Sequence, residues 1–435
     1  MTDSRSLQRA LWVLFAVNVL NFYDRSIAGA LAEPIRREFD LSDTQIGFLG
    51  TAFIWLYAIV GVPIGRLADR FSRKNILGWG VLIWSALTGL NGLAQNFGML
   101  LGARLGVAVG EAACAPTATS WIGDLFPPDK RSRALARFML GVPVGAALSY
   151  FFSGPLAQAY GWRMAMVVAA VPAALLVPLL LRLPEPVRGA SETMKEGAAA
   201  GSMWRVLRIP TIWWIIASGT LLNFNMYAFG TFLPALFSRV HGLTLAQSGI
   251  ATGIVYAVGG IGGGLLAGRV GDYVVHKRKD GRLLAAAGFA LLTAPFALFG
   301  ISLPAGSLAL AVALIAFAFA GCNTYYGFVY STIQDIVPPS LRGTTMAIYF
   351  MAMYMMGASV GPLLTGHVSD WRAHAAAQAA GSSKVTEQFR AIGLQEGMLM
   401  IPLLSLGLAV VLWAGSRTIT SDMARRESAA VQAVA

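Results

Sequence analysis

The stretch GRLADRFSRKN, residues Gly65–Asn75, follows a long apolar run and recurs in weaker form as GRVGDYVVHKRK, beginning at Gly268. Each copy has a glycine, then an aspartate, then a cluster of basic residues. Each also comes directly after a run long enough to cross a bilayer as a helix. Two copies of one loop, about 200 residues apart, predict a chain built from two related halves.

Three further pairs of segments keep the same order along the two halves. They are LNFYD at Leu20 with LNFNM at Leu222, LSDTQIG at Leu41 with LTLAQSG at Leu243, and DLFPPDKR at Asp124 with DIVPPSLR at Asp335. The second pair contains capping boxes, Ser42-x-x-Gln45 and Thr244-x-x-Gln247, which predict where helices begin. The double prolines of the third pair predict where helices stop.

Composition indicates which solvent surrounds these helices. Of 435 residues, 56% are hydrophobic and 12% are charged, about half the charged share of an average soluble domain. Twelve apolar runs of about 20 residues can each span the hydrocarbon, six before the polar stretch near Gly189 and six after it. We therefore predict an all-α membrane protein of two pseudo-symmetric six-helix bundles, without a cleaved signal peptide.

The predicted bundles occupy residues 1–183 and 211–435, and a cytoplasmic linker rich in Pro, Gly and charge occupies 184–210. Six is an even number, so both repeats enter the membrane from the same side. Small-residue ladders predict close helix contacts. They are Gly61-x-x-x-Gly65, Gly141-x-x-x-Gly145, Gly260-x-x-x-Gly264 and Gly357-x-x-x-Gly361.

The net charge of +12 reflects topology. With the N-terminus placed inside, most of the 33 Lys and Arg residues fall in loops on the inner side, as the positive-inside rule requires. We expect a bacterial inner-membrane protein with both termini in the cytoplasm and no nucleic-acid partner. The two cysteines, Cys114 and Cys322, lie within predicted spans, and no disulfide, metal site or cofactor is expected.

Four ionisable residues lie deep in apolar runs of the first half: Asp24, Arg25, Arg104 and Glu111. A charge at the bilayer centre costs about 2.5–3.5 kcal/mol, so such residues usually mark an ion or substrate path. Arg104 and Glu111 share one helix face but lie about 10 Å apart, too far for a direct bridge. Glu111 could instead reach Arg25, or Asp24 could reach Arg104.

We interpret Asp24 and Glu111 as proton-coupling groups and Arg25 and Arg104 as substrate-binding groups. Two alternatives stay open, namely static charges that support helix packing and, for Arg104, a place at the outer rim. The position that matches Asp24 in the second repeat is Met226. The charged machinery is therefore predicted in the first bundle alone.

The second half offers soft, aromatic and uncharged polar residues at comparable depth. Those assigned to substrate binding are Asn223, Asn225, Tyr227, Tyr325 and Tyr326. The alternative for most of them is a place in the core or against lipid. If part of the set lines a cavity, one wall is charged and the other apolar, which suits an amphiphile with an ionic head and a greasy tail.

The glycine, aspartate and basic cluster of Gly65–Asn75 resemble the signature loop of the major facilitator superfamily, and the repeat and linker agree with that fold over the whole chain. The resemblance implies that Asp69 latches an inner gate, with Arg70 and Arg73 around it, although Ser72 stands where glycine is usual. The alternative is a basic loop that only sets topology. Gating roles are implied for Asp69, Arg70, Arg73, Asp124, Arg131, Asp272, Asp335 and Arg342.

Three segments resemble the spinster branch of the superfamily more narrowly. They are NFYDRSIAGAL from Asn21, RLGVAVGEAACAPTATSWIGDLFPPDKRSRA from Arg104, and VPVGAALSYFFSGPLAQAYGWR from Val142. That branch includes proton-linked or facilitative carriers of lysophospholipids and sphingosine phosphate. The neighbouring anion and cation symporter branch shares part of the second pattern.

We therefore expect a secondary transporter, not an enzyme, that works by rocking of its bundles and couples a lysolipid-like amphiphile to protons. One alternative is a proton symporter of small organic anions such as sugar acids. A second alternative, of another class, is a membrane receptor or scaffold that transports nothing. The expected partners are the substrate, protons and membrane lipids, and the chain is expected to act as a monomer.

Overall fold

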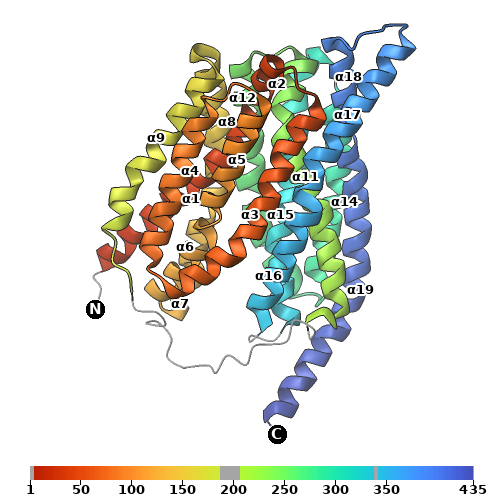
Figure 1. Ribbon diagram of the computed structural model, residues 1–435. Coiled ribbons are helices and arrows are strands. Elements are labelled where there is room, and N and C mark those ends of the chain that lie inside the picture. The colour runs from red at the N-terminus through yellow and green to blue at the C-terminus, as the bar shows by residue number, and fades with distance from the viewer. Residues whose placement is uncertain (1–3, 187–205, 338–340, 435) are drawn as a thin grey trace. The chain divides into compact units, whose positions relative to one another are not determined.

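The computed structural model describes residues 4–186, 206–337 and 341–434. The side chains of Asp69 and Asp272, both predicted gating residues, lie outside the described residues, as do those at 4–5, 128–129, 132, 275, 343–344 and 427–434. All the regular elements in the described ranges are helices (Figure 1). The predicted all-α fold is confirmed.

The chain divides into two compact units. Unit 1 is Met1–Glu196 with Leu243–Gly253, and unit 2 is Gly197–Gly242 with Ile254–Ala435. The segment Leu243–Gly253 packs on unit 1, although its sequence belongs to the second repeat. The predicted bundle and linker boundaries stay a prediction.

Unit 1 contains the helices from the first repeat and one short helix from the second (Figure 1). They are α1 (Ser4–Ala30), α2 (Ala32–Phe39), α3 (Asp43–Arg70), α4 (Arg73–Asn91), α5 (Phe97–Glu111), α6 (Cys114–Leu125), α7 (Pro128–Met139), α8 (Gly141–Tyr160), α9 (Trp162–Leu181) and α12 (Leu245–Ile254), the last of these reaching the unit boundary.

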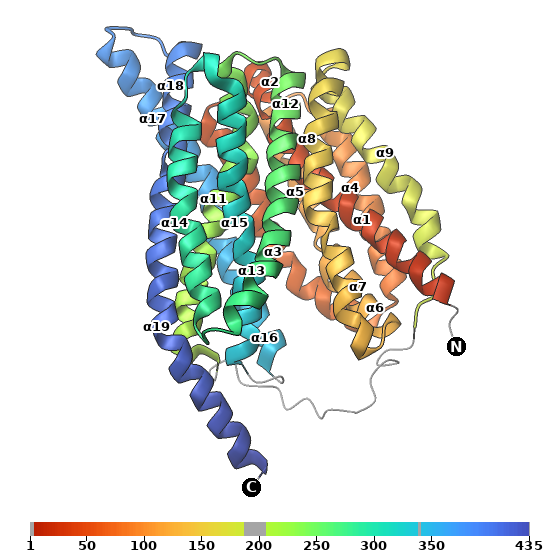
Figure 2. The same ribbon diagram turned by 180° about the vertical axis from the view of Figure 1, so that it is seen from behind.

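Unit 2 holds the remaining helices, drawn in green to blue in Figure 2. They are α11 (Pro210–His241), the π-helix η1 (Val255–Ile261), α13 (Gly262–Val275), α14 (Gly281–Ser302), the 3-10 helix η2 (Ala305–Ser307), α15 (Leu308–Ile336), α16 (Arg342–Ala352), the π-helix η4 (Met353–Ala358), α17 (Val360–Ala379), α18 (Glu387–Met398) and α19 (Met400–Val434).

Nine stretches of the described chain are long and apolar enough to cross a membrane. The remaining predicted spans correspond to α1, α4 and α11, which are long helices but fall outside that set. Such stretches are present in both repeats, and the count of twelve membrane spans stays a prediction. We call the end of each unit that carries the Gly65–Asn75 loop or its repeat the inner end, following the predicted topology.

The capping boxes begin helices as predicted. Ser42 accepts a hydrogen bond from the backbone N–H of Gln45 at 3.2 Å, and the Gln45 side chain accepts one from the Ser42 backbone N–H at 2.9 Å. Thr244 and Gln247 form the same reciprocal pair at 3.3 and 3.1 Å. Each box supplies acceptors for amides that have no partner inside the helix.

Two of the four glycine ladders bring helices into close contact. A Cβ on Gly145 of α8 would lie 2.1 Å from the carbonyl oxygen of Val19 in α1, and one on Gly361 of α17 would lie 2.5 Å from that of Phe224 in α11. Glycine is therefore required where α1 crosses α8 and where α11 crosses α17. Gly61 and Gly264 meet nothing within 4 Å among the described residues, and a Cβ on Gly65 would meet Cβ of Pro116 in α6 at 3.9 Å, an ordinary contact that does not require glycine.

The start of α11 is held by a carboxylate from the far end of the chain. Asp422 of α19 is only 4% exposed and accepts hydrogen bonds from the backbone N–H and the hydroxyl of Thr211, at 3.0 and 2.6 Å. The first amides of a helix have no partner within it, and a carboxylate there also faces the positive end of the helix dipole. The C-terminal helix therefore anchors the first helix of unit 2.

We expect Asp422→Ala to lower the thermal midpoint of the purified protein, by an amount equivalent to about 1–2 kcal/mol, because a cap and a buried hydrogen bond are lost together. Asp422→Asn keeps an acceptor oxygen and is the matched control, expected to lose less. Equal midpoints for the alanine variant and the wild type would show that the cap contributes nothing.

Candidate functional site

A buried ion pair joins α1 to α5 in unit 1. Arg25 of α1 places Nε 3.3 Å from Oε2 of Glu111, the last residue of α5. Their side chains are 8% and 0% exposed. The other carboxylate oxygen of Glu111 has no hydrogen-bond partner among the described residues. One of the two predicted pairings is thus present, and it leaves half of the carboxylate unsatisfied.

Arg104 contacts the same stretch of α1 in a different way from the prediction. Its Nη1 donates to the backbone oxygen of Asp24 at 2.9 Å and its Nη2 to that of Arg25 at 2.8 Å. The guanidinium is 5% exposed and makes these bonds from α5, so it holds α1 by its backbone. The contact with Asp24 runs to the main chain, whereas the prediction paired the two side chains.

Two aromatic rings on α3 complete this cluster. The guanidinium of Arg25 lies 4.3 Å from the ring centroid of Tyr57, and that of Arg104 lies 4.4 Å from the centroid of Phe53. Phe53 and Tyr57 stack on each other with centroids 6.3 Å apart. An arginine over a ring face gains about 2 kcal/mol or more when desolvated. The rings thus stabilise both cations away from water.

Asp24 is 1% exposed, and neither of its carboxylate oxygens has a hydrogen-bond partner among the described residues. The Thr88 hydroxyl of α4 lies near this carboxylate. A buried ionised carboxylate without good partners costs several kcal/mol, and a bound proton removes that cost. Asp24 and Glu111 are the carboxylates of this cluster with oxygens still able to take a proton or a ligand.

In unit 2, Asn223 of α11 is the centre of an uncharged polar group. Its amide nitrogen donates to the backbone oxygen of Gly219 at 2.9 Å and to the sulfur of Met353 at 3.2 Å. Its side-chain oxygen accepts a hydrogen bond from the hydroxyl of Tyr326 at 3.4 Å. Tyr227 lies on the next turn of α11 and makes an edge-to-face contact with Tyr354 at 6.3 Å between centroids.

Two other predicted binding residues of unit 2 make packing contacts. Asn225 is fully buried and donates to the hydroxyl of Ser405 in α19 at 3.0 Å. Tyr325 is 2% exposed and its hydroxyl lies 2.7 Å from that of Ser218 in α11. These contacts join α11 to α19 and α15. The ring of Tyr325 also packs edge-to-face on Tyr326, the tyrosine that donates to Asn223, with centroids 5.8 Å apart.

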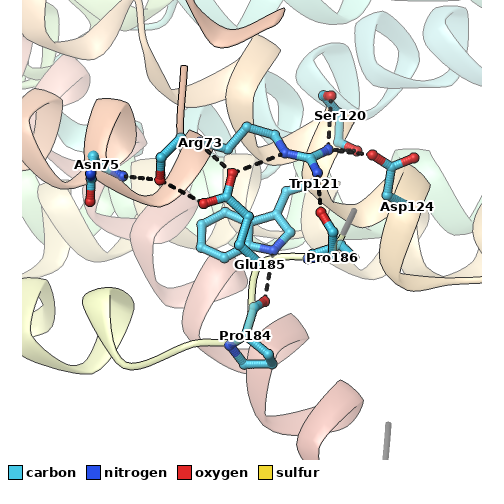
Figure 3. Close-up of polar contacts among 9 residues, drawn as sticks. Arg73, Asn75, Ser120, Trp121, Asp124, Pro184, Glu185 and Pro186 are labelled. Atoms are coloured by element: carbon cyan, nitrogen blue, oxygen red, sulfur yellow. Dashed lines mark hydrogen bonds and ion pairs between the residues drawn. The ribbon is translucent and has the colours of Figure 1, made fainter. Parts of the chain in front are cut away.

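The inner end of unit 1 contains a second charged cluster (Figure 3). Arg73, the first residue of α4, is 1% exposed, and its Nη1 lies 2.5 Å from Oδ2 of Asp124 near the end of α6. The Nη1 group also donates to the backbone oxygen of Ser120 at 3.1 Å. Arg73 and Asp124, both predicted gating residues, therefore fix the beginning of α4 to the end of α6.

Unit 2 repeats this pair at the corresponding place. Arg282 near the start of α14 forms an ion pair with Asp335 near the end of α15. Arg282 was missed by sequence reasoning, although it lies 209 residues after Arg73 and the repeat offset points to it. Arg342 donates to the backbone oxygen of Gln334 at 3.0 Å.

Two further predicted gating residues lie at the end of α3 and the beginning of α7. Arg70 is exposed at the end of α3. Arg131 lies in the first turn of α7, where its backbone N–H donates to the oxygen of Pro127 at 2.9 Å. The sequence also gave no reason to select Phe53 and Tyr57, although their spacing of four residues places both rings on one helix face.

The carboxylate of Glu185, which follows α9, lies 3.6 Å from Nε of Arg73 and accepts hydrogen bonds at the start of α4. Partial burial by itself raises the pKa of Glu185. The bonds from Ser72 and from two backbone N–H groups, together with the Arg73 charge, outweigh burial and hold the pKa below its usual range.

We expect the stability that Glu185 contributes to depend on pH in one direction. Because its pKa is lower in the folded chain, the contribution is complete above the ordinary value of 4.5 and is lost as pH falls through the folded value. The gap between the melting midpoints of the wild type and Glu185→Gln should stay constant from about pH 8 to 5 and close below that. A gap that widens on acidification would contradict this assignment.

Comparison with known proteins identifies the family. A sequence model described as Major Facilitator Superfamily matches residues 14–362. The chain belongs to the major facilitator superfamily. Among its relatives, an "MFS-type efflux pump" of Mycolicibacterium smegmatis is 32% identical over 374 residues, which cover 83% of this chain and 84% of the relative. "Protein spinster" of Drosophila melanogaster is 30% identical over 387 residues, covering 84% of this chain and 63% of that protein.

Solved structures agree with this assignment. A bacterial homologue of the human lysosomal transporter spinster, in an inward-facing and unoccupied conformation, superposes with a TM-score of 0.86 at 27% identity and covers 97% of this chain and 99% of that chain. The D-xylose-proton symporter gives 0.71 at 17% identity over 93% and 97%, a likeness of fold alone. This superfamily member is thus a membrane transporter that is similar to the spinster branch.

Proposed function

We propose that this transporter couples the movement of an anionic, lysolipid-like amphiphile to protons by alternating access. One observation carries the proposal: unit 1 buries the side chains of Asp24, Arg25, Arg104 and Glu111 in apolar helices, and three carboxylate oxygens of Asp24 and Glu111 have no hydrogen-bond partner among the described residues. Intramembrane charges of this kind serve ion and substrate paths far more often than packing. Two buried guanidinium groups supply attraction for an anionic head group, and the two carboxylates supply proton sites.

The character of unit 2 favours the amphiphile over a small polar anion. The residues around Asn223 are aromatic or sulfur-containing and include no charge among those described, namely Tyr227, Tyr326, Met353 and Tyr354. Such soft surfaces accept apolar chains of varied shape. Unit 1 thus supplies groups suited to an ionic head, and unit 2 supplies groups suited to an apolar tail.

The alternative substrate is a small organic anion such as a sugar acid, which the two guanidinium groups could hold equally well. Purified protein in liposomes separates the two. We expect a fluorescent lysophosphatidylglycerol to accumulate under an imposed pH gradient and to stop when a protonophore collapses the gradient. Accumulation of glucuronate, with none of the lysolipid, would favour the alternative. A lack of flux for both would favour the receptor hypothesis.

A further inference from the structure

At the inner end of unit 1, the chain that follows α9 lies beside the buried pair of Arg73 and Asp124 (Figure 3). We call residues Pro184–Pro186 the strap. The backbone oxygen of Pro184 accepts a hydrogen bond at 3.2 Å from the ring nitrogen of Trp121, a fully buried residue of α6. The backbone oxygen of Pro186 accepts one at 2.9 Å from Nη2 of Arg73. The strap is therefore fixed to both α4 and α6.

The middle residue of the strap, Glu185, caps the N-terminus of α4. Its Oε1 accepts the backbone N–H of Arg73 at 2.6 Å, and its Oε2 accepts the hydroxyl of Ser72 at 2.6 Å. Ser72 is the N-cap of α4. The first amides of a helix lack partners within it, and a carboxylate at this end also faces the positive end of the dipole. Glu185 thus fixes the position at which the Gly65–Asn75 loop becomes a helix.

At the inner end of unit 2, the residue that corresponds to Glu185 in its place is a cation, Arg426. The last helix of unit 2, α19, continues past the bundle, and Arg426 donates through Nη1 to the backbone oxygens of Asp335 at 2.6 Å and Gln334 at 3.2 Å. These carbonyls belong to the last turn of α15, where a cation is favoured by the dipole. Asp335 is the residue that pairs with Arg282.

We propose that the chain at the inner end of the sixth predicted span of each unit positions the gating residues at that end. Glu185, which follows α9, does so in unit 1, and Arg426 of α19 does so in unit 2. Glu185 touches no substrate; it acts through Arg73 and Ser72 on the loop that carries the implied gating residues. The strap then moves with unit 1, and the tether between the units begins after Pro186. The inference rests on the alternating access of the proposed function and is independent of which substrate or ion is carried.

The test compares Glu185→Gln with Glu192→Gln, the same change seven residues further along the linker. The first readout needs no substrate: hydrogen exchange of backbone amides at residues 71–76 should be at least about tenfold faster in Glu185→Gln, equivalent to about 1.4 kcal/mol. Glu192→Gln should match the wild type. Arg426→Ala should speed exchange in the last turn of α15 and leave residues 71–76 unchanged.

The second readout is transport of fluorescent lysophosphatidylglycerol in liposomes. A positioning role predicts that Glu185→Gln lowers Vmax about tenfold and changes KM by less than about twofold, with part of Vmax recovered in Glu185→Asp. A Gly-Ser insertion after Gly189 should leave both unchanged, because it lengthens the tether and spares the strap.

Equal exchange in the two glutamine variants would overturn the proposal whatever the flux. Faster exchange with an unchanged Vmax would also overturn it, since the strap would then be purely structural. If the wild type does not carry the lysolipid, the proposed substrate is wrong, and the Vmax comparison is made with glucuronate.

Discussion

Replacing Arg25 by alanine is expected to cause the largest loss of stability of any single change in the buried charged cluster. The substitution leaves Glu111, which is 0% exposed, without the guanidinium at 3.3 Å. Removing one partner of a buried pair typically costs about 3–5 kcal/mol, because the other charge stays buried and uncompensated. The melting midpoint of the purified protein in detergent measures this loss, and flux in liposomes should be abolished.

Paired variants separate the cost of the uncompensated buried charge from the loss of function. Arg25→Ala combined with Glu111→Gln removes both charges, so the midpoint should recover most of its wild-type value while transport stays absent. Arg25→Lys keeps the charge but not the planar group that lies over Tyr57, and should be intermediate in stability. If Arg25→Ala melts with the wild type, the ion pair does not hold α1 to α5.

Asp24→Asn is expected to uncouple transport from the proton gradient. The substitution keeps the shape of a side chain that is 1% exposed but removes its ability to bind and release a proton. Accumulation of lysophosphatidylglycerol under a pH gradient should fall to the level seen with a protonophore, while exchange of substrate across the membrane continues. Flux assays with and without the gradient separate these two activities.

Asp40→Asn is the matched control for this change. Asp40 is exposed after α2 and has a positive φ of 47°, a conformation that asparagine also adopts readily. The Asp40→Asn variant should accumulate lysophosphatidylglycerol as the wild type does. Wild-type accumulation by Asp24→Asn would remove Asp24 from the coupling role and leave Glu111 as the candidate.

The sequence predicted the architecture well because its signals are local and repeated. Apolar length predicts a span, and a capping box such as Ser42 with Gln45 predicts the residue at which a helix begins. The four matched landmarks fixed the internal repeat without any knowledge of contacts. The sequence could not predict that Leu243–Gly253 belongs to unit 1, because this depends on packing between segments far apart in the chain.

Contacts within the cluster were predicted only in part. Charges in apolar spans are visible in a sequence, and the pair of Arg25 with Glu111 was one of two pairings considered. Arg104 binds backbone oxygens of α1, and no side-chain pattern reports such a bond. Glu185 was hidden because a carboxylate in a polar linker looks like a solvated charge until its hydrogen bonds to the start of α4 are seen.

The central claim is that substrate and protons move together through the charged cluster of unit 1. The most direct measurement follows the internal pH of liposomes that contain the protein while a gradient of lysophosphatidylglycerol, and no pH gradient, is imposed. We predict that the substrate gradient changes the internal pH with the wild type and with Asp40→Asn, but not with Asp24→Asn. Substrate crossing through the wild type with no change in internal pH would contradict the claim.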